Sequence, residues 1–154
     1  MKFLLCILML LFAPMPVLSV ELIMMGQNLE KESLLAVEKN KVFMLYISRP
    51  ACPYCARLEE QVLNPMLNSN EYDSLVILRE LSTNGGQVID FDGQRKPAVD
   101  ITRRYEIVGT PTLLFLDDNG AELTQRITGY HSEGFYWYYL DAAIQSARSK
   151  IQQP

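Results

Sequence analysis

Apolar and polar residues follow one another in blocks along the chain, and these blocks predict both strands and helices. Lys41 to Ser48 is an almost unbroken apolar stretch, typical of a strand buried on both faces in the middle of a sheet. Leu75 to Leu81 predicts a second core strand. Leu29 to Lys39 and Ser132 to Ile151 have the mixed pattern of helices that pack one face on a core.

A further helix is expected between the two core strands. It opens at Cys52, and apolar residues recur at four-residue spacing at Leu58, Val62 and Met66. Pro65 lies inside this pattern. Because a proline inside a helix lacks the N–H that the helix needs, Pro65 is expected to kink or end it.

The second half of the chain predicts shorter elements. Thr83 to Lys96 is irregular and reads as a small inserted hairpin or loop, and Val99 to Tyr105 as a short helix. Thr112 to Leu116 and Glu122 to Thr128 flank Asp117-Asp118-Asn119-Gly120, a strong hairpin signal. The order of these elements predicts a compact three-layer α/β domain, with a central mixed sheet flanked by helices.

The first residues have the pattern of a leader. Residues 1–19 resemble a secretory signal peptide: Lys2 gives a positive start, Phe3 to Phe12 is apolar, and the small Ser19 fits a cleavage position. Cleavage there would leave residues 20–154 as the mature domain. We therefore expect export across the inner membrane.

An uncleaved membrane anchor is the alternative, because Leu22 to Met25 prolong the apolar character. Glu21 and two prolines interrupt a span of the length that a membrane requires. Cys6 lies in the leader, so a mature chain would keep only Cys52 and Cys55. Disulfides persist in extracytoplasmic compartments. The sequence predicts a periplasmic protein, with a membrane-anchored protein facing the periplasm as the alternative.

Composition and charge narrow the classes of partner and cofactor. The 154 residues are 49% hydrophobic and 21% charged, as in an ordinary globular domain. A formal net charge of −4 without a basic stripe argues against nucleic acid and acidic membrane surfaces as partners. A zinc site needs four ligands, and beyond the two cysteines a mature chain offers only His131 and carboxylates. We expect no metal and no other cofactor.

The sequence Cys52-Pro53-Tyr54-Cys55 carries the candidate chemistry. On an opening helix, two cysteines three residues apart lie on one face and can form a small disulfide ring. Closing so short a loop stabilises a fold by only roughly 2 kcal/mol, before any strain is subtracted. A reversible, redox-active disulfide explains the pair better than a structural one.

Together with Gly109-Thr110-Pro111-Thr112 downstream, this motif makes residues 28–150 resemble the thioredoxin superfamily. Asp90 to Gly93 and Gly129-Tyr130 are similar to the secreted thioredoxin-related proteins of the SoxW type. The resemblance implies that Pro111 follows a cis peptide bond and lies against the cysteines. There the backbone of Thr110 could pair with an extended substrate segment.

A cysteine at a helix N-terminus is favoured as the thiolate, so we expect Cys52 to attack a substrate disulfide. Cys55, one turn inward, would then resolve the mixed disulfide, with Pro53 and Tyr54 completing the site. The chain departs from typical thioredoxins in two respects. Ala51 replaces a tryptophan, and the first core strand lacks a buried acid, which leaves open how Cys55 loses its proton.

Three functions fit these features. The first is a disulfide reductase for protein substrates, kept reduced by a membrane electron donor. The second is a dithiol oxidant that donates disulfides, and the third is a redox-dependent binding module or chaperone without turnover. The chain has no room for the separate dimerisation domain of DsbG-like isomerases. We expect a monomer.

Overall fold

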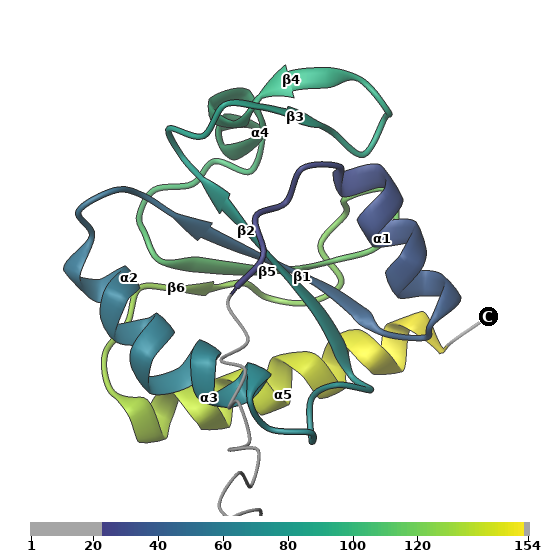
Figure 1. Ribbon diagram of the computed structural model, residues 1–154. Coiled ribbons are helices and arrows are strands. Elements are labelled where there is room, and N and C mark those ends of the chain that lie inside the picture. Colours follow the sequence, from purple (N-terminus) through teal and green to yellow (C-terminus); the bar gives the residue numbers. More distant parts are fainter. Residues whose placement is uncertain (1–22, 153–154) are drawn as a thin grey trace, which may run out of the picture.

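The computed structural model describes residues 23–152. The expected leader, residues 1–19, lies outside the described residues. The helices are α1 (Leu29–Glu38), α2 (Pro53–Leu58), the π-helical η1 (Glu59–Leu63), α3 (Asn64–Leu67), α4 (Ala98–Arg104) and α5 (Glu133–Ile151). The strands are β1 (Val42–Ser48), β2 (Val76–Ser82), β3 (Gln87–Ile89), β4 (Arg95–Pro97), β5 (Thr112–Leu116) and β6 (Ile127–Thr128). Figure 1 shows how they are arranged.

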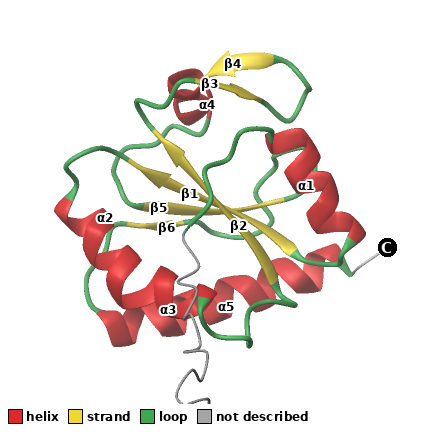
Figure 2. Cartoon of the chain, viewed as in Figure 1, coloured by secondary structure: helices red, strands yellow, loops and turns green. Residues whose placement is uncertain are grey.

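The central sheet has the strand order β2-β1-β5-β6. β1 runs parallel to β2 and antiparallel to β5, and β5 is antiparallel to β6. All seven residues of β1 are buried, as the apolar stretch predicted. Helices cover both faces of this sheet, so the predicted three-layer α/β fold with a central mixed sheet is confirmed (Figure 2).

Alternate residues of β1 enter different halves of the core, because successive side chains of a strand point to opposite faces. Met44 and Tyr46 pack in a cluster with α2, η1 and α5. Phe43 and Ile47 pack in a second cluster with α1 and α4. The sheet is thus covered by α2, η1, α3 and α5 on one side and by α1 and α4 on the other (Figure 1).

Helical structure continues past Pro65, which sequence analysis expected to kink or end the helix. The backbone N–H of Asn64 bonds to the carbonyl of Glu59, five residues back, as in a π-helical turn. Pro65 then lies in the first turn of α3, where an N–H is not needed, and the helix ends after Leu67. The π turn shifts the hydrogen-bond register directly before Pro65, so the helix can continue past a residue that has no N–H to donate.

The two predicted hairpins differ in outcome. The irregular stretch from Thr83 to Lys96 contains a true antiparallel pair, β3 with β4. In the second hairpin, the expected strand from Glu122 to Thr128 is reduced to β6 and one isolated bridge between Leu116 and Glu122. Arg126 bonds to the carboxylate of Glu122 and donates to the carbonyl of Tyr105, 2.5 Å away, which ties this segment to the end of α4. The N–H of Leu123 still donates to the carbonyl of Phe115 in β5 at 2.8 Å.

The turn at Asp117 to Gly120, enclosed by the bridge between Leu116 and Glu122, predicts a measurable effect on stability. Gly120 has φ +80°, and an added Cβ would lie 2.7 Å from the Phe91 ring and 2.7 Å from the Tyr105 hydroxyl. We expect Gly120→Ala to lower the free energy of unfolding by about 1–2 kcal/mol from the left-handed backbone alone. Gly86→Ala is the matched control, since no atom lies within 4 Å of its added Cβ. Equal urea midpoints for the two variants would contradict this expectation.

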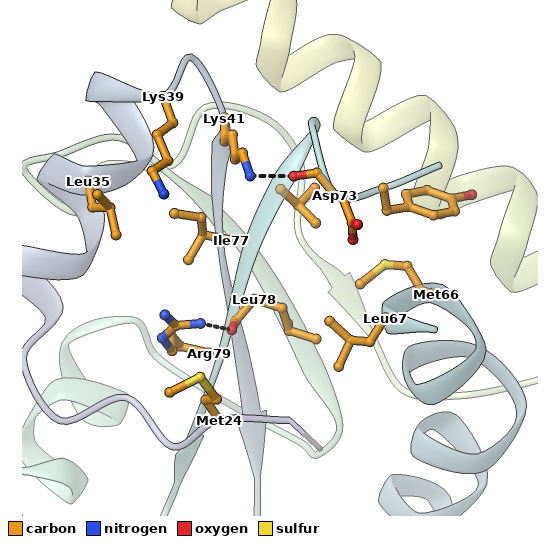
Figure 3. Close-up of a pocket in the computed structure, with 12 residues that line it drawn as sticks. Met24, Leu35, Lys39, Lys41, Met66, Leu67, Asp73, Ile77, Leu78 and Arg79 are labelled. Atoms are coloured by element: carbon orange, nitrogen blue, oxygen red, sulfur yellow. Dashed lines mark hydrogen bonds between the residues drawn. The ribbon is translucent and has the colours of Figure 1, made fainter. Parts of the chain in front are cut away.

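The outer edge of the sheet, at β2, is partly covered. The segment at Met25 forms a parallel bridge with Glu80 and covers one half of this edge. The other half borders a pocket of about 410 Å³, where the Arg79 guanidinium donates to the carbonyl of Leu78 at 2.7 Å (Figure 3). A charged side chain that occupies an edge carbonyl discourages strand pairing with other chains.

Within residues 23–152, no helix has the length and apolar character to cross a membrane.

Candidate active site

The cysteine pair lies where β1 gives way to α2, at the end of the sheet (Figure 1). Cys52 is the N-cap of α2, and Pro53 follows in the first turn, where its missing N–H costs little. Cys52 and Cys55 form a disulfide, with their Cα atoms 5.2 Å apart. Ala51, directly before the pair, has φ +54°. The structure therefore places both sulfurs at the start of the helix, as the sequence predicted.

Tertiary folding brings a distant loop against the first sulfur. The Sγ atom of Cys52 lies 3.5 Å from the Thr110 hydroxyl and 3.6 Å from the Thr110 carbonyl oxygen. The backbone N–H of Cys55 donates to the same sulfur at 3.1 Å. The peptide bond between Thr110 and Pro111 is cis, as the resemblance implied. The Pro111 carbonyl accepts a 2.8 Å bond from the N–H of Gly129, which anchors this loop beside β6.

Cys55 lies deeper and shares its pocket with an acid. This pocket, of about 440 Å³, is lined by both cysteines and by Glu59, one turn beyond Cys55. The hydroxyl of Tyr46, from the middle of β1, donates to the Glu59 carboxylate at 2.7 Å. Burial raises the pKa of Tyr46, and the bond to Glu59 raises it further. Tyr46 therefore stays protonated and serves as a donor to this carboxylate.

The rim of the site carries exposed apolar side chains. Tyr54 is 54% exposed, with the Arg57 guanidinium 5.9 Å from its ring centre. Val108, two residues before Thr110, is 93% exposed. Exposed apolar surface beside a reactive group is typical of a binding surface. The structure thus brings together all of the site residues predicted from sequence, which are Cys52, Pro53, Tyr54, Cys55, Thr110 and Pro111.

Two residues of this region were not identified from sequence. Tyr46 lies within the apolar stretch of the first core strand, and sequence analysis assigned no role to Glu59. One signal was available, since residues four apart on a helix share a face and Glu59 follows Cys55 at that spacing. The strand-to-helix contact that joins Tyr46 to Glu59 has no counterpart in the spacing of the sequence. Among residues 23–152, no group of three or more His, Cys, Asp or Glu residues could hold a metal ion.

Comparison with known proteins agrees with this site. The family model described as "Thioredoxin-like domain" matches residues 29–144. A relative, the thiol:disulfide interchange protein DsbD of Actinobacillus pleuropneumoniae serotype 5b (strain L20), is 26% identical over 102 residues. The match spans 66% of this chain and only 16% of that protein, so the chain corresponds to a small part of it.

Solved structures share the fold at low sequence identity. A thioredoxin from Thermus thermophilus has a TM-score of 0.58 and 22% identity, with 79% of this chain and 87% of that chain covered. The DsbH oxidoreductase has a TM-score of 0.56 and 15% identity, with 88% and 92% covered. The family match over residues 29–144 shows that the chain belongs to the thioredoxin-like domain family, and the fold and the cysteine pair at the start of α2 agree with this.

Proposed function

We propose that this protein is an extracytoplasmic reductase of protein disulfides, with Cys52 as the nucleophile and Cys55 as the resolving thiol. The observation that carries this proposal is the position of the Cys52 sulfur. It caps the helix, accepts the N–H of Cys55 at 3.1 Å and lies 3.5 Å from the Thr110 hydroxyl. Each of these donors stabilises a thiolate more than a thiol, so they favour the reactive form of Cys52.

The reaction runs in two exchanges. The Cys52 thiolate attacks one sulfur of a substrate disulfide, and the other substrate sulfur leaves with the bonding electrons as a thiolate. The sulfur of Cys55 then attacks Cys52, releases the second substrate thiolate and closes the Cys52–Cys55 disulfide seen in the structure. The protein loses two electrons and the substrate disulfide gains them.

The rim supports binding of an extended, apolar substrate segment. The Thr110 backbone lies directly beside the attacking sulfur and offers strand-type hydrogen bonds to such a segment. Tyr54, next to Cys55 in sequence, and Val108, two residues before Thr110, offer exposed apolar surface. Backbone pairing with few side-chain demands suits a reductase that acts on several protein substrates.

The location and the partners of the protein belong to the same proposal. Residues 1–19 resemble a signal peptide, and Asp90 to Gly93 with Gly129-Tyr130 resemble SoxW-type proteins. Residues 20–154 would then be the mature periplasmic domain, acting as a monomer. A membrane electron donor would return electrons to the Cys52–Cys55 disulfide. The name of the DsbD relative, a thiol:disulfide interchange protein, supports the exchange chemistry itself.

Reduction of insulin disulfides by dithiothreitol tests the activity. A catalytic amount of the protein should accelerate insulin precipitation, and Cys52→Ser should not, because the attacking thiolate is gone. Equilibration with a glutathione buffer then tests the direction: a reductase poised near thioredoxin, at about −270 mV, remains mostly disulfide-bonded where a strong oxidant near −120 mV is reduced. No acceleration by the wild-type protein would favour a binding module, and a potential near the oxidant value would reverse the proposed direction.

A further inference from the structure

The resolving step needs a proton acceptor, because thiolate is the nucleophile and an ordinary thiol has a pKa of about 8.5. Cys55 is buried, 3% exposed, so it is screened from solvent bases. The strand that leads into the site, β1, contains Tyr46 but no acid, and the hydroxyl of a protonated tyrosine cannot by itself keep a proton taken from a thiol. A base must therefore come from another element.

We infer that Glu59 accepts the proton of Cys55 during resolution and that Tyr46 positions its carboxylate, an inference that rests on the proposed reductase function. Glu59 follows Cys55 by four residues, and side chains at this spacing are neighbours on a helix, with Cβ atoms about 5–6 Å apart. Glu59 and Cys55 line the same pocket of about 440 Å³. Glu59 is half-buried, so part of its side chain is shielded from solvent.

The local backbone and the Tyr46 side chain fix the position of Glu59. The π-helical segment η1 begins at this residue, and its carbonyl accepts the N–H of Asn64. Single π turns inside helices occur frequently at functional sites, where they displace side chains from the regular helical register. Tyr46 is fully buried and donates to the Glu59 carboxylate at 2.7 Å, which holds the carboxylate toward the interior of the site.

The charged groups nearby come from several elements. Arg49, from the loop before the cysteines, lines the same pocket as Glu59. Electrostatic interactions with Glu80 of β2 and Tyr136 of α5 also raise the pKa of Tyr46. Tyr46 therefore remains a hydrogen-bond donor over the working pH range. The carboxylate can gain a proton while this bond is kept through its other oxygen.

The proton and electron balance of the step is complete. Cys55 gives its proton to the Glu59 carboxylate, and its sulfur forms a bond to the sulfur of Cys52. The bond between Cys52 and the substrate sulfur breaks, and that sulfur leaves as a thiolate with both electrons. Glu59 then returns its proton to the released thiolate or to water in the open pocket.

Rapid mixing of the reduced protein with excess dithiobis(nitrobenzoic acid), a chromogenic disulfide, separates the two exchanges. Attack by Cys52 releases the first coloured thiolate, and attack by Cys55 releases the second. At about pH 6.5, Glu59→Gln should slow the second release by about 100-fold, the usual contribution of a positioned acid or base, and leave the first unchanged. The deficit should shrink as the pH rises, because hydroxide in the solvent can then take the proton without the help of Glu59.

Tyr46→Phe keeps the carboxylate but removes its donor, so the second release should slow by less than in Glu59→Gln and with the same pH trend. Glu60→Gln, an exposed neighbouring acid, is the matched control and should behave as wild type. Matching rates of wild type and Glu59→Gln at high pH would show that the variant is folded. A second release that is unchanged at about pH 6.5, or slowed equally at every pH, would overturn the assignment. A wild-type protein without the first release would instead contradict the proposed function itself, and the inference with it.

Discussion

Replacing Cys55 with serine should trap the protein on its substrate. Cys52 can still attack a disulfide, but the mixed disulfide has no internal thiol to release it. Release should slow by about a thousandfold or more in the absence of added thiol, since an external reductant cannot match the effective concentration of a neighbouring group. A covalent adduct should accumulate with reduced Cys55→Ser and appear on non-reducing gels.

The matched control is Cys52→Ser, which should form no adduct. The structure gives the reason for this difference, because only Cys52 caps the helix and lies against Thr110. Adducts that form with Cys52→Ser and not with Cys55→Ser would reverse the order of attack. The same gels, run on material from an extracytoplasmic fraction, would identify the protein substrates by mass spectrometry.

Removal of the Asp90 carboxylate should lower the stability of the fold. The Asp90 side chain is fully buried and forms a two-pronged pair with Arg104, at 2.6 and 2.9 Å, and a 2.8 Å bond with Lys96. It also accepts the N–H of Phe91 at 2.9 Å. Breaking one side of a buried pair costs about 3–5 kcal/mol. Because Arg104 and Lys96 are partly exposed and can be rehydrated, we expect about 2–3 kcal/mol for Asp90→Ala.

Urea unfolding measures this loss, with Asp100→Ala as the control. Asp100 pairs with Arg103 on the helix surface, where both side chains are largely exposed, so its removal should cost less than about 0.5 kcal/mol. A similar loss of unfolding free energy in the two variants would show that the burial of Asp90 does not increase its contribution to stability. Since the cluster ties the β3–β4 hairpin to α4, hydrogen exchange in that hairpin should rise first.

The same cluster predicts how stability depends on pH. Burial alone would raise the pKa of Asp90, but hydrogen bonds from Arg104 and Lys96 outweigh burial and lower the pKa. A carboxyl whose pKa is lower in the folded state stabilises the fold above its unfolded pKa of about 3.9. This contribution is lost as pH falls below that value and through the lower folded pKa. The difference in free energy of unfolding between wild type and Asp90→Ala should therefore become smaller at acid pH.

The sequence by itself determined most of the elements and singled out the cysteine pair. A short, unbroken apolar stretch is typical of a strand buried on both faces, so β1 and β2 were predictable within a residue or two. The spacing of Cys52 and Cys55 is local, and a local spacing on a helix gives a local geometry. The turn at Asp117 to Gly120 was predictable for the same reason, because its glycine supplies the backbone conformation required there.

Only the tertiary structure decided which distant residues surround that pair. Thr110 reaches Cys52 across 58 positions of sequence, and Tyr46 reaches Glu59 across the interface between a strand and a helix. The register of neighbouring elements sets such contacts, and packing of the whole core sets that register. The spacing of residues within one helix or strand does not reveal how that element is positioned against its neighbours. Local chemistry was therefore readable from the chain, while the groups that tune this chemistry became visible only once the strands and helices were packed.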